Sequence, residues 1–142
     1  MAIGKHETKK STAANALSEA FGEFQSLAEE MADWADKIEE RFSQTEKYER
    51  VRAAQETLEQ LQEPECPAKL KDVEIEYTQG LPKSKRSGLS RADRCSNATI
   101  ILDVLIEICA EAEDDDELSS FADELENAKS EAEGVEFPSM FG

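Results

Sequence analysis

The residues with the clearest chemical potential are five cations that lie close together in the sequence. This basic segment contains Lys83, Lys85, Arg86, Arg91 and Arg94. Ser90 is a favourable helix N-cap, so Arg91 and Arg94 would lie in the first turns of a helix, where the macrodipole disfavours cations. Free backbone N–H groups at such a helix start favour anions. The segment therefore predicts a site for a phosphate or a partner's carboxylate. Alternatively, the cations pair with acidic helices of this chain or of a second subunit.

The last third of the chain is strongly acidic. From residue 99 to residue 142, fourteen acids are opposed by Lys129 alone. We predict an acidic interaction surface in its densest run, which consists of Glu111, Glu113, Asp114, Asp115, Asp116 and Glu117. This run lacks the glycine and the ligand spacing of an EF-hand loop, and no carboxylate-x-x-His pair suits a di-iron site, so no metal is predicted. Rows of carboxylates on a helical body can instead imitate the phosphates of a DNA duplex.

Other groups that could do chemistry lack companions. His6 is the only histidine and lies in a segment with little to bury. The cysteines are Cys66, Cys95 and Cys109, which are widely spaced without a CxxC pair and are interpreted as free thiols, buried like small hydrophobes. Neither a glycine-rich phosphate loop nor a nucleophile with a histidine partner occurs. We therefore expect neither an enzyme nor a cofactor.

Hydrophobic periodicity predicts the helices that must position these groups. Between residues 17 and 42, apolar residues recur at alternating spacings of four and three, which places them on one helical face. The pattern resumes at Tyr48, out of phase by about one residue. Ser43 and Glu46 resemble a capping box, yet neither glycine nor proline occurs between Glu23 and Glu63. We expect a helix over about 12–62 that is kinked or broken near residue 43, and we favour a continuous, kinked helix.

The remaining chain divides into a loop-rich connection and two further helices. Pro64 and Pro67 end the first helix and open the connection, residues 63–89. Within it, alternating apolar and polar residues predict a short strand near 73–78, as a strap across the helices or as an edge that pairs with a second chain. Helices are expected over 90–112, the most hydrophobic one, and over 115–133. Residues 1–10 are predicted to be a flexible tail. Residues 134–142 form a C-terminal tail that docks on the helices or serves as a linear motif.

These elements predict an all-α protein with one helical domain at residues 11–133. The two helical segments, 12–62 and 90–133, are similar in length and would form a long helical hairpin. A hairpin with such wide apolar stripes would leave apolar surface exposed. We therefore predict self-association into a helical bundle of four or more helices.

Composition narrows the function. The 142-residue chain has a net charge of −17, which repels nucleic acid and anionic lipid. It has no apolar run long enough to span a membrane and no apolar signal-peptide core, so a cytoplasmic location is expected. We predict a non-enzymatic, acidic helical protein that binds another protein as a scaffold, accessory subunit or inhibitor, a type common in phages. The alternatives are contact with nucleic acid through residues 83–94 and DNA mimicry.

Overall fold

The protein is mostly helical and contains one small antiparallel sheet. The computed structural model describes residues 3–42, 46–82, 89–112 and 114–137, and the side chains of 3–6, 39–42 and 82 are not included in that description. The elements are β1 (Ile3–Thr12), α1 (Ala13–Phe42), α2 (Glu46–Gln60), α3 (Ala68–Lys71), β2 (Glu74–Pro82), α4 (Arg91–Ala110) and α5 (Asp116–Glu133). The predominantly helical fold is confirmed, and β1 and β2 add a two-stranded sheet to it, of which only a strand near 73–78 was predicted.

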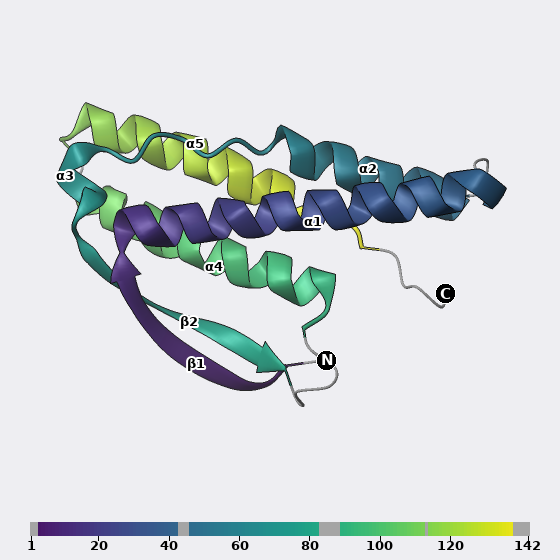
Figure 1. Ribbon diagram of the computed structural model, residues 1–142. Helices are drawn as coiled ribbons and strands as arrows, with labels where there is room; N and C mark the ends of the chain where they lie inside the picture. The colour runs from purple at the N-terminus through teal and green to yellow at the C-terminus, as the bar shows by residue number, and fades with distance from the viewer. Residues whose placement is uncertain (1–2, 43–45, 83–88, 113, 138–142) are drawn as a thin grey trace.

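The first predicted helix is two helices. α1 ends at Phe42, and α2 folds back along it (Figure 1), so the favoured continuous helix over 12–62 is wrong and a break near residue 43 is correct. Residues 43–45 lie outside the described residues. The physical reason is the change of phase in the apolar pattern after Phe42, since a straight helix would turn the later apolar residues away from the earlier stripe. With α2 folded back over α1, Val51 and Leu58 are fully buried. The first arm of the predicted hairpin is therefore folded on itself.

The predicted flexible tail is strand β1. It pairs with β2 in antiparallel register, with Thr8 opposite Thr78 and Lys10 opposite Glu76. The hydroxyl oxygens of Thr8 and Thr78 are 2.9 Å apart on the outer face. The predicted strand near 73–78 is thus confirmed, but its partner is neither a helix nor a second chain. Sequence analysis missed β1 because its residues are polar and lack an apolar alternation.

α4 is the central helix, as its hydrophobicity predicted. It packs against α1, α5 and β2, and Figure 1 shows it between the sheet and α5. Its buried residues include Ala98, Ile101, Leu102 and Leu105, which occupy more than one face. A helix covered on several sides lacks the single apolar stripe of a surface helix. α4 therefore connects the sheet to the rest of the core.

Side-chain caps fix the starts of the last two helices. The Ser90 hydroxyl accepts a hydrogen bond from the Asp93 N–H at 3.1 Å, and the Asp115 carboxylate accepts one from the Leu118 N–H at 3.1 Å. Each satisfies a backbone donor that the helix leaves unpaired. The start at Ser90 was predicted from its residue type, and the second start agrees with the predicted helix over 115–133.

The apolar stripes are covered within one chain. Val73 is the only large apolar residue exposed among those whose side chains are described. Val135 and Phe137 are half-buried against the core, which agrees with the predicted docking of the C-terminal segment. Residues 138–142 lie outside the described residues. The exposed apolar surface on which self-association was predicted is therefore absent from the described residues. Self-association remains a prediction without that support.

Candidate functional site

The two described arginines of the basic segment face the protein's own helix α1. Arg94 lies at the second turn of α4, pairs through Nε with Glu23, and places Nη1 2.7 Å from the Glu30 carboxylate. Arg91 Nε lies 3.1 Å from the same Glu30. Burial alone would lower the pKa of Arg94, but hydrogen bonds to Glu23 and Glu30 outweigh it and raise that pKa. These arginines thus pair with the chain's own acids.

Trp34 joins this ionic cluster to α2. The Arg91 guanidinium lies 5.1 Å from the centroid of the Trp34 ring, and Lys47 Nζ lies 5.6 Å from it. Both cations are within reach of the negative face of the ring. The arginines at the start of α4 are therefore part of the packing of α1, α2 and α4. The other three predicted cations, Lys83, Lys85 and Arg86, lie outside the described residues.

The acidic run lies at the turn between α4 and α5, away from these arginines. Asp115 caps α5 and pairs with Lys69 Nζ at 2.5 Å. The hydrogen bond from Lys69, together with that from the Leu118 N–H, holds the pKa of Asp115 below its usual range. Glu113 lies outside the described residues, and the other members of the run are exposed, namely Glu111, Asp114, Asp116 and Glu117. Asp115 thus has a structural role. No group of three possible metal ligands occurs among the described residues.

The exposed face of α5 carries the largest group of carboxylates. These exposed acids, called the α5 acidic face below, are Asp116, Glu117, Asp123, Glu124, Glu126, Glu131 and Glu133. Lys129 is the only cation on α5, and its Nζ is 2.5 Å from Asp103 of α4. α5 lies on the far side of the helices from the sheet (Figure 1). The α5 acidic face therefore extends the predicted acidic surface along a whole helix.

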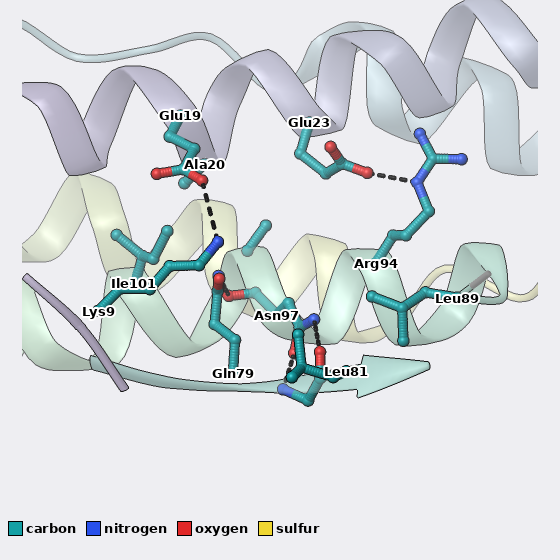
Figure 2. A pocket seen from close by; sticks show the side chains of 12 residues that line it. Lys9, Glu19, Ala20, Glu23, Gln79, Leu81, Leu89, Arg94, Asn97 and Ile101 are labelled. Atoms are coloured by element: carbon teal, nitrogen blue, oxygen red, sulfur yellow. Dashed lines mark hydrogen bonds and ion pairs between the residues drawn. The ribbon is translucent and has the colours of Figure 1, made fainter. Parts of the chain in front are cut away.

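A cavity of about 400 Å³ opens between α1, α4 and the sheet. Its lining includes two small side chains, Ala20 of α1 and Ala98 of α4, and Figure 2 shows it from close by. The rest of the lining combines charged, polar and apolar residues, which are Lys9, Glu19, Glu23, Gln79, Gly80, Leu81, Leu89, Arg94, Asn97 and Ile101. Its size falls within the range of small-molecule sites, which is about 300 to 1,000 Å³.

Asn97 forms the polar wall of this cavity. Its side-chain amide accepts a hydrogen bond from the Gly80 N–H and donates one to the Gly80 carbonyl, both at 3.0 Å (Figure 2). Gln79 donates to the Asn97 backbone carbonyl at 3.0 Å. Asn97 thus pairs with the edge of β2 as a neighbouring strand would. This clamp fixes the sheet to α4.

Glu19 links the two strands to α1. The Tyr77 hydroxyl of β2 donates to Glu19 Oε2 at 2.9 Å, and Lys9 Nζ of β1 lies 4.0 Å from Glu19 Oε1. Burial, together with the hydrogen bond and the negative charge of Glu19, raises the pKa of Tyr77 to about 12. The neutral phenol is therefore the form that the fold stabilises.

The Tyr77 hydroxyl should consequently lose its proton only at unusually high pH, and its ionisation should destabilise the fold. Its pKa in the unfolded chain is about 10, so its contribution is complete below pH 10 and is lost as the pH rises toward 12. Ultraviolet absorbance of phenolate should show a component near pH 12 that disappears in Tyr77→Phe. In Glu19→Gln that component should move to lower pH, because the acceptor's charge is removed. Titration of Tyr77 near 10 in the folded protein would contradict this prediction.

Sequence analysis did not find the cavity. Lys9 was placed in a flexible tail, Gly80 was assigned to the loop-rich connection, and Asn97 lay within the helix expected over 90–112 without a predicted role. The structure brings these residues together through the pairing of β1 with β2. The one relevant signal was the apolar alternation of residues 73–78, which indicated a strand with one face buried. Nothing in the sequence indicated which segment would cover it.

The cysteines lie apart from both surfaces. Cys95 and Cys109 are buried and free, as predicted, and Cys66 is half-buried. Burial raises the pKa of Cys95 to about 11, and burial likewise raises the pKa of Cys109. A thiol whose pKa is raised is mostly protonated at neutral pH and is a poor nucleophile. Cys95 and Cys109 therefore act as small buried side chains that pack in the core.

Similarity to known proteins gives no guide to function. Comparisons of the chain with protein-family models, with curated proteins and with solved structures found no match. No helix in the described ranges is long and apolar enough to cross a bilayer. Function is therefore inferred from the geometry and charge of the described residues.

Proposed function

We propose that the protein is a non-enzymatic, cytoplasmic binding protein whose partner is another protein with a basic surface. In this proposal the four long helices act as one rigid bundle, and the protein serves as a scaffold, accessory subunit or inhibitor. The observation that carries the proposal is the α5 acidic face, which runs the length of a helix while the helix's lysine is paired elsewhere. Such a concentration of one charge attracts and orients an oppositely charged partner.

A shallow groove beside α5 extends this surface. It lies between residues 60–64 and α5, and Glu63, Glu124 and Glu131 contribute carboxylates to it. Ser18 donates a hydrogen bond to Glu63 at 3.3 Å, and no cation among the described residues pairs with the other two carboxylates. Lysine or arginine side chains of a partner fit these acceptors.

Nucleic-acid binding through the basic segment is less well supported. Arg91 and Arg94 are held by Glu23 and Glu30, so their charges are already balanced. The net charge of −17 adds a repulsive field. DNA mimicry is a special case of the proposed function, in which the basic partner is itself a DNA-binding protein. Duplex DNA would then compete with this protein for the partner.

The proposal is tested by removing charge from the α5 acidic face. The triple variant Glu124→Gln, Glu126→Gln and Glu131→Gln should weaken binding of a basic partner by about tenfold, since three exposed ion pairs at about 0.5 kcal/mol each total about 1.5 kcal/mol. The partner is first captured on immobilised protein and identified by mass spectrometry. Its affinity is then measured by calorimetry at low and physiological salt, where screening should also weaken binding.

A matched control separates a specific surface from overall charge. The control variant carries Glu29→Gln, Asp33→Asn and Asp36→Asn, three exposed positions on α1 with the same total change in charge. It should bind like the wild-type protein. Equal losses in both triple variants would contradict a specific α5 site. Salt-sensitive binding of labelled DNA or RNA that disappears in the Arg91→Glu, Arg94→Glu variant would favour the nucleic-acid alternative.

A further inference from the structure

The cavity between α1, α4 and the sheet contains carboxylate oxygens with unused hydrogen-bonding capacity. Glu19 Oε2 is occupied by the Tyr77 hydroxyl, but the nearest cation to Glu19 Oε1 is Lys9 at 4.0 Å, the outer limit of an ion pair. Glu23 uses Oε1 for Arg94, and among the described residues no side chain pairs with its Oε2. Figure 2 shows both side chains directed from α1 toward the cavity.

These two carboxylates lie on one face of α1 and both line the cavity. Glu19 and Glu23 are four residues apart on α1, so they are neighbours on one face, with Cβ atoms about 5 to 6 Å apart. Oxygen atoms of carboxylates accept hydrogen bonds and cannot donate them. The complementary ligand group is therefore a cation with several N–H donors, which is a primary ammonium or a guanidinium.

The opposite side of the cavity suits an apolar body. Ala98 and Ile101 of α4 line it, together with Leu81 and Leu89 from the segments beside the cavity mouth. An apolar chain of a few carbons in contact with these side chains would be removed from water, which stabilises the bound state. The cavity thus combines paired acceptors with an apolar wall.

The charges around the cavity admit a cation. Its lining contains two cations, Lys9 and Arg94, and two carboxylates, so it has no net positive charge. Arg94 is held between Glu23 and Glu30, which leaves its charge balanced by two acids. The chain as a whole carries −17, which favours the entry of cations over anions.

We propose that this cavity binds an organic cation, with its ammonium or guanidinium group between Glu19 and Glu23 and its apolar body against Ala98 and Ile101. Such a group belongs either to a free small amine or to a lysine or arginine side chain of another protein. The site is separate from the α5 acidic face and does not depend on the function proposed for that face.

The test compares two probes of similar shape and opposite charge. n-Hexylamine, which is protonated at pH 7, and hexanoate are each titrated into the isotopically labelled protein and followed by two-dimensional NMR. Hexylamine should perturb the amides of Gly80, Ala98 and Ile101 in a saturable manner. Hexanoate should leave them unchanged at the same concentration. Absence of a saturable shift with hexylamine, or equal binding of hexanoate, would overturn the proposal.

Variants locate the cation. Glu19→Gln should weaken hexylamine binding by about three- to fivefold, because an ion pair at a half-exposed carboxylate is lost while the amide oxygen still accepts from Tyr77. Glu29→Gln removes the same charge from an exposed position of α1 and should leave the affinity unchanged. Circular dichroism verifies that both variants are folded. Equal affinities in the two variants would place the cation elsewhere and refute the assignment.

A third probe distinguishes the source of the cation. A short peptide with blocked termini, in which one lysine is the only charged residue, is titrated in the same way. If the peptide binds more tightly than hexylamine and Glu19→Gln weakens it, the natural ligand is a side chain of a partner. If hexylamine binds and the peptide does not, the ligand is a free small amine. Both results support the cation site, because in each the Glu19 carboxylate is required.

Discussion

Replacing Asn97 by alanine should lower the free energy of unfolding by about 2 to 4 kcal/mol, because two buried polar groups lose their partners. These groups are the N–H and the carbonyl of Gly80, which the Asn97 side chain bonds at 3.0 Å each. Asn97 is only 8% exposed, so water reaches these groups incompletely after the change. Urea denaturation of the wild-type and variant proteins measures the difference.

An isosteric substitution separates the hydrogen bonds from packing. Asn97→Asp keeps the shape but places a carboxylate oxygen against the Gly80 carbonyl, so it should destabilise the fold at least as much as alanine. Asn127→Ala removes an exposed asparagine from α5 and should change stability by less than about 0.5 kcal/mol. If Asn97→Ala lowers the free energy of unfolding no more than Asn127→Ala does, the hydrogen bonds between Asn97 and Gly80 do not stabilise the packing of the sheet on α4.

Replacing Leu58 by alanine should lower the free energy of unfolding by about 2 to 5 kcal/mol, which is the range for truncating a buried leucine. Leu58 is fully buried because α2 folds back along α1. On a continuous helix over 12–62, the same side chain would extend away from the core, and its truncation would matter only in an oligomer. The loss should therefore be independent of protein concentration, which chemical denaturation at two concentrations can verify.

Val73→Ala is the matched control for Leu58. Val73 is an apolar residue that is 38% exposed, so its truncation should cost less than about 0.5 kcal/mol. A similarly small effect for Leu58→Ala would contradict the packing of α2 on α1. A large effect that vanishes at high protein concentration would instead restore the predicted self-association.

The sequence predicted the elements that have a strong local signal. The apolar stripe of α1, the hydrophobic α4, the cap at Ser90 and the helix over 115–133 were all identified from periodicity and residue type. Each signal depends on residues within a few turns of one another. The structure confirms them because local propensity and burial agree at these positions.

The missed features depend on contacts between distant residues. β1 has a polar sequence, so only its pairing with residues 74–82 makes it a strand. The reversal between α1 and α2 contains neither glycine nor proline, and the phase change at Tyr48 was compatible with a kink as well as a break. The macrodipole argument drew attention to Arg91 and Arg94, but their carboxylate partners on α1 were not evident from spacing. The cavity required the pairing of β1 with β2 and the packing of α4 on α1.

The pairing of β1 with β2 also constrains the order of events during synthesis on the ribosome. β2 follows β1 only after α1, α2 and α3. At about 5 to 20 residues per second, the roughly sixty intervening residues leave β1 unpaired for about 3 to 12 s. Its polar, lysine-containing sequence disfavours pairing with another nascent chain in that interval. The same lack of apolar residues that conceals the strand in the sequence would thus protect it until its partner emerges.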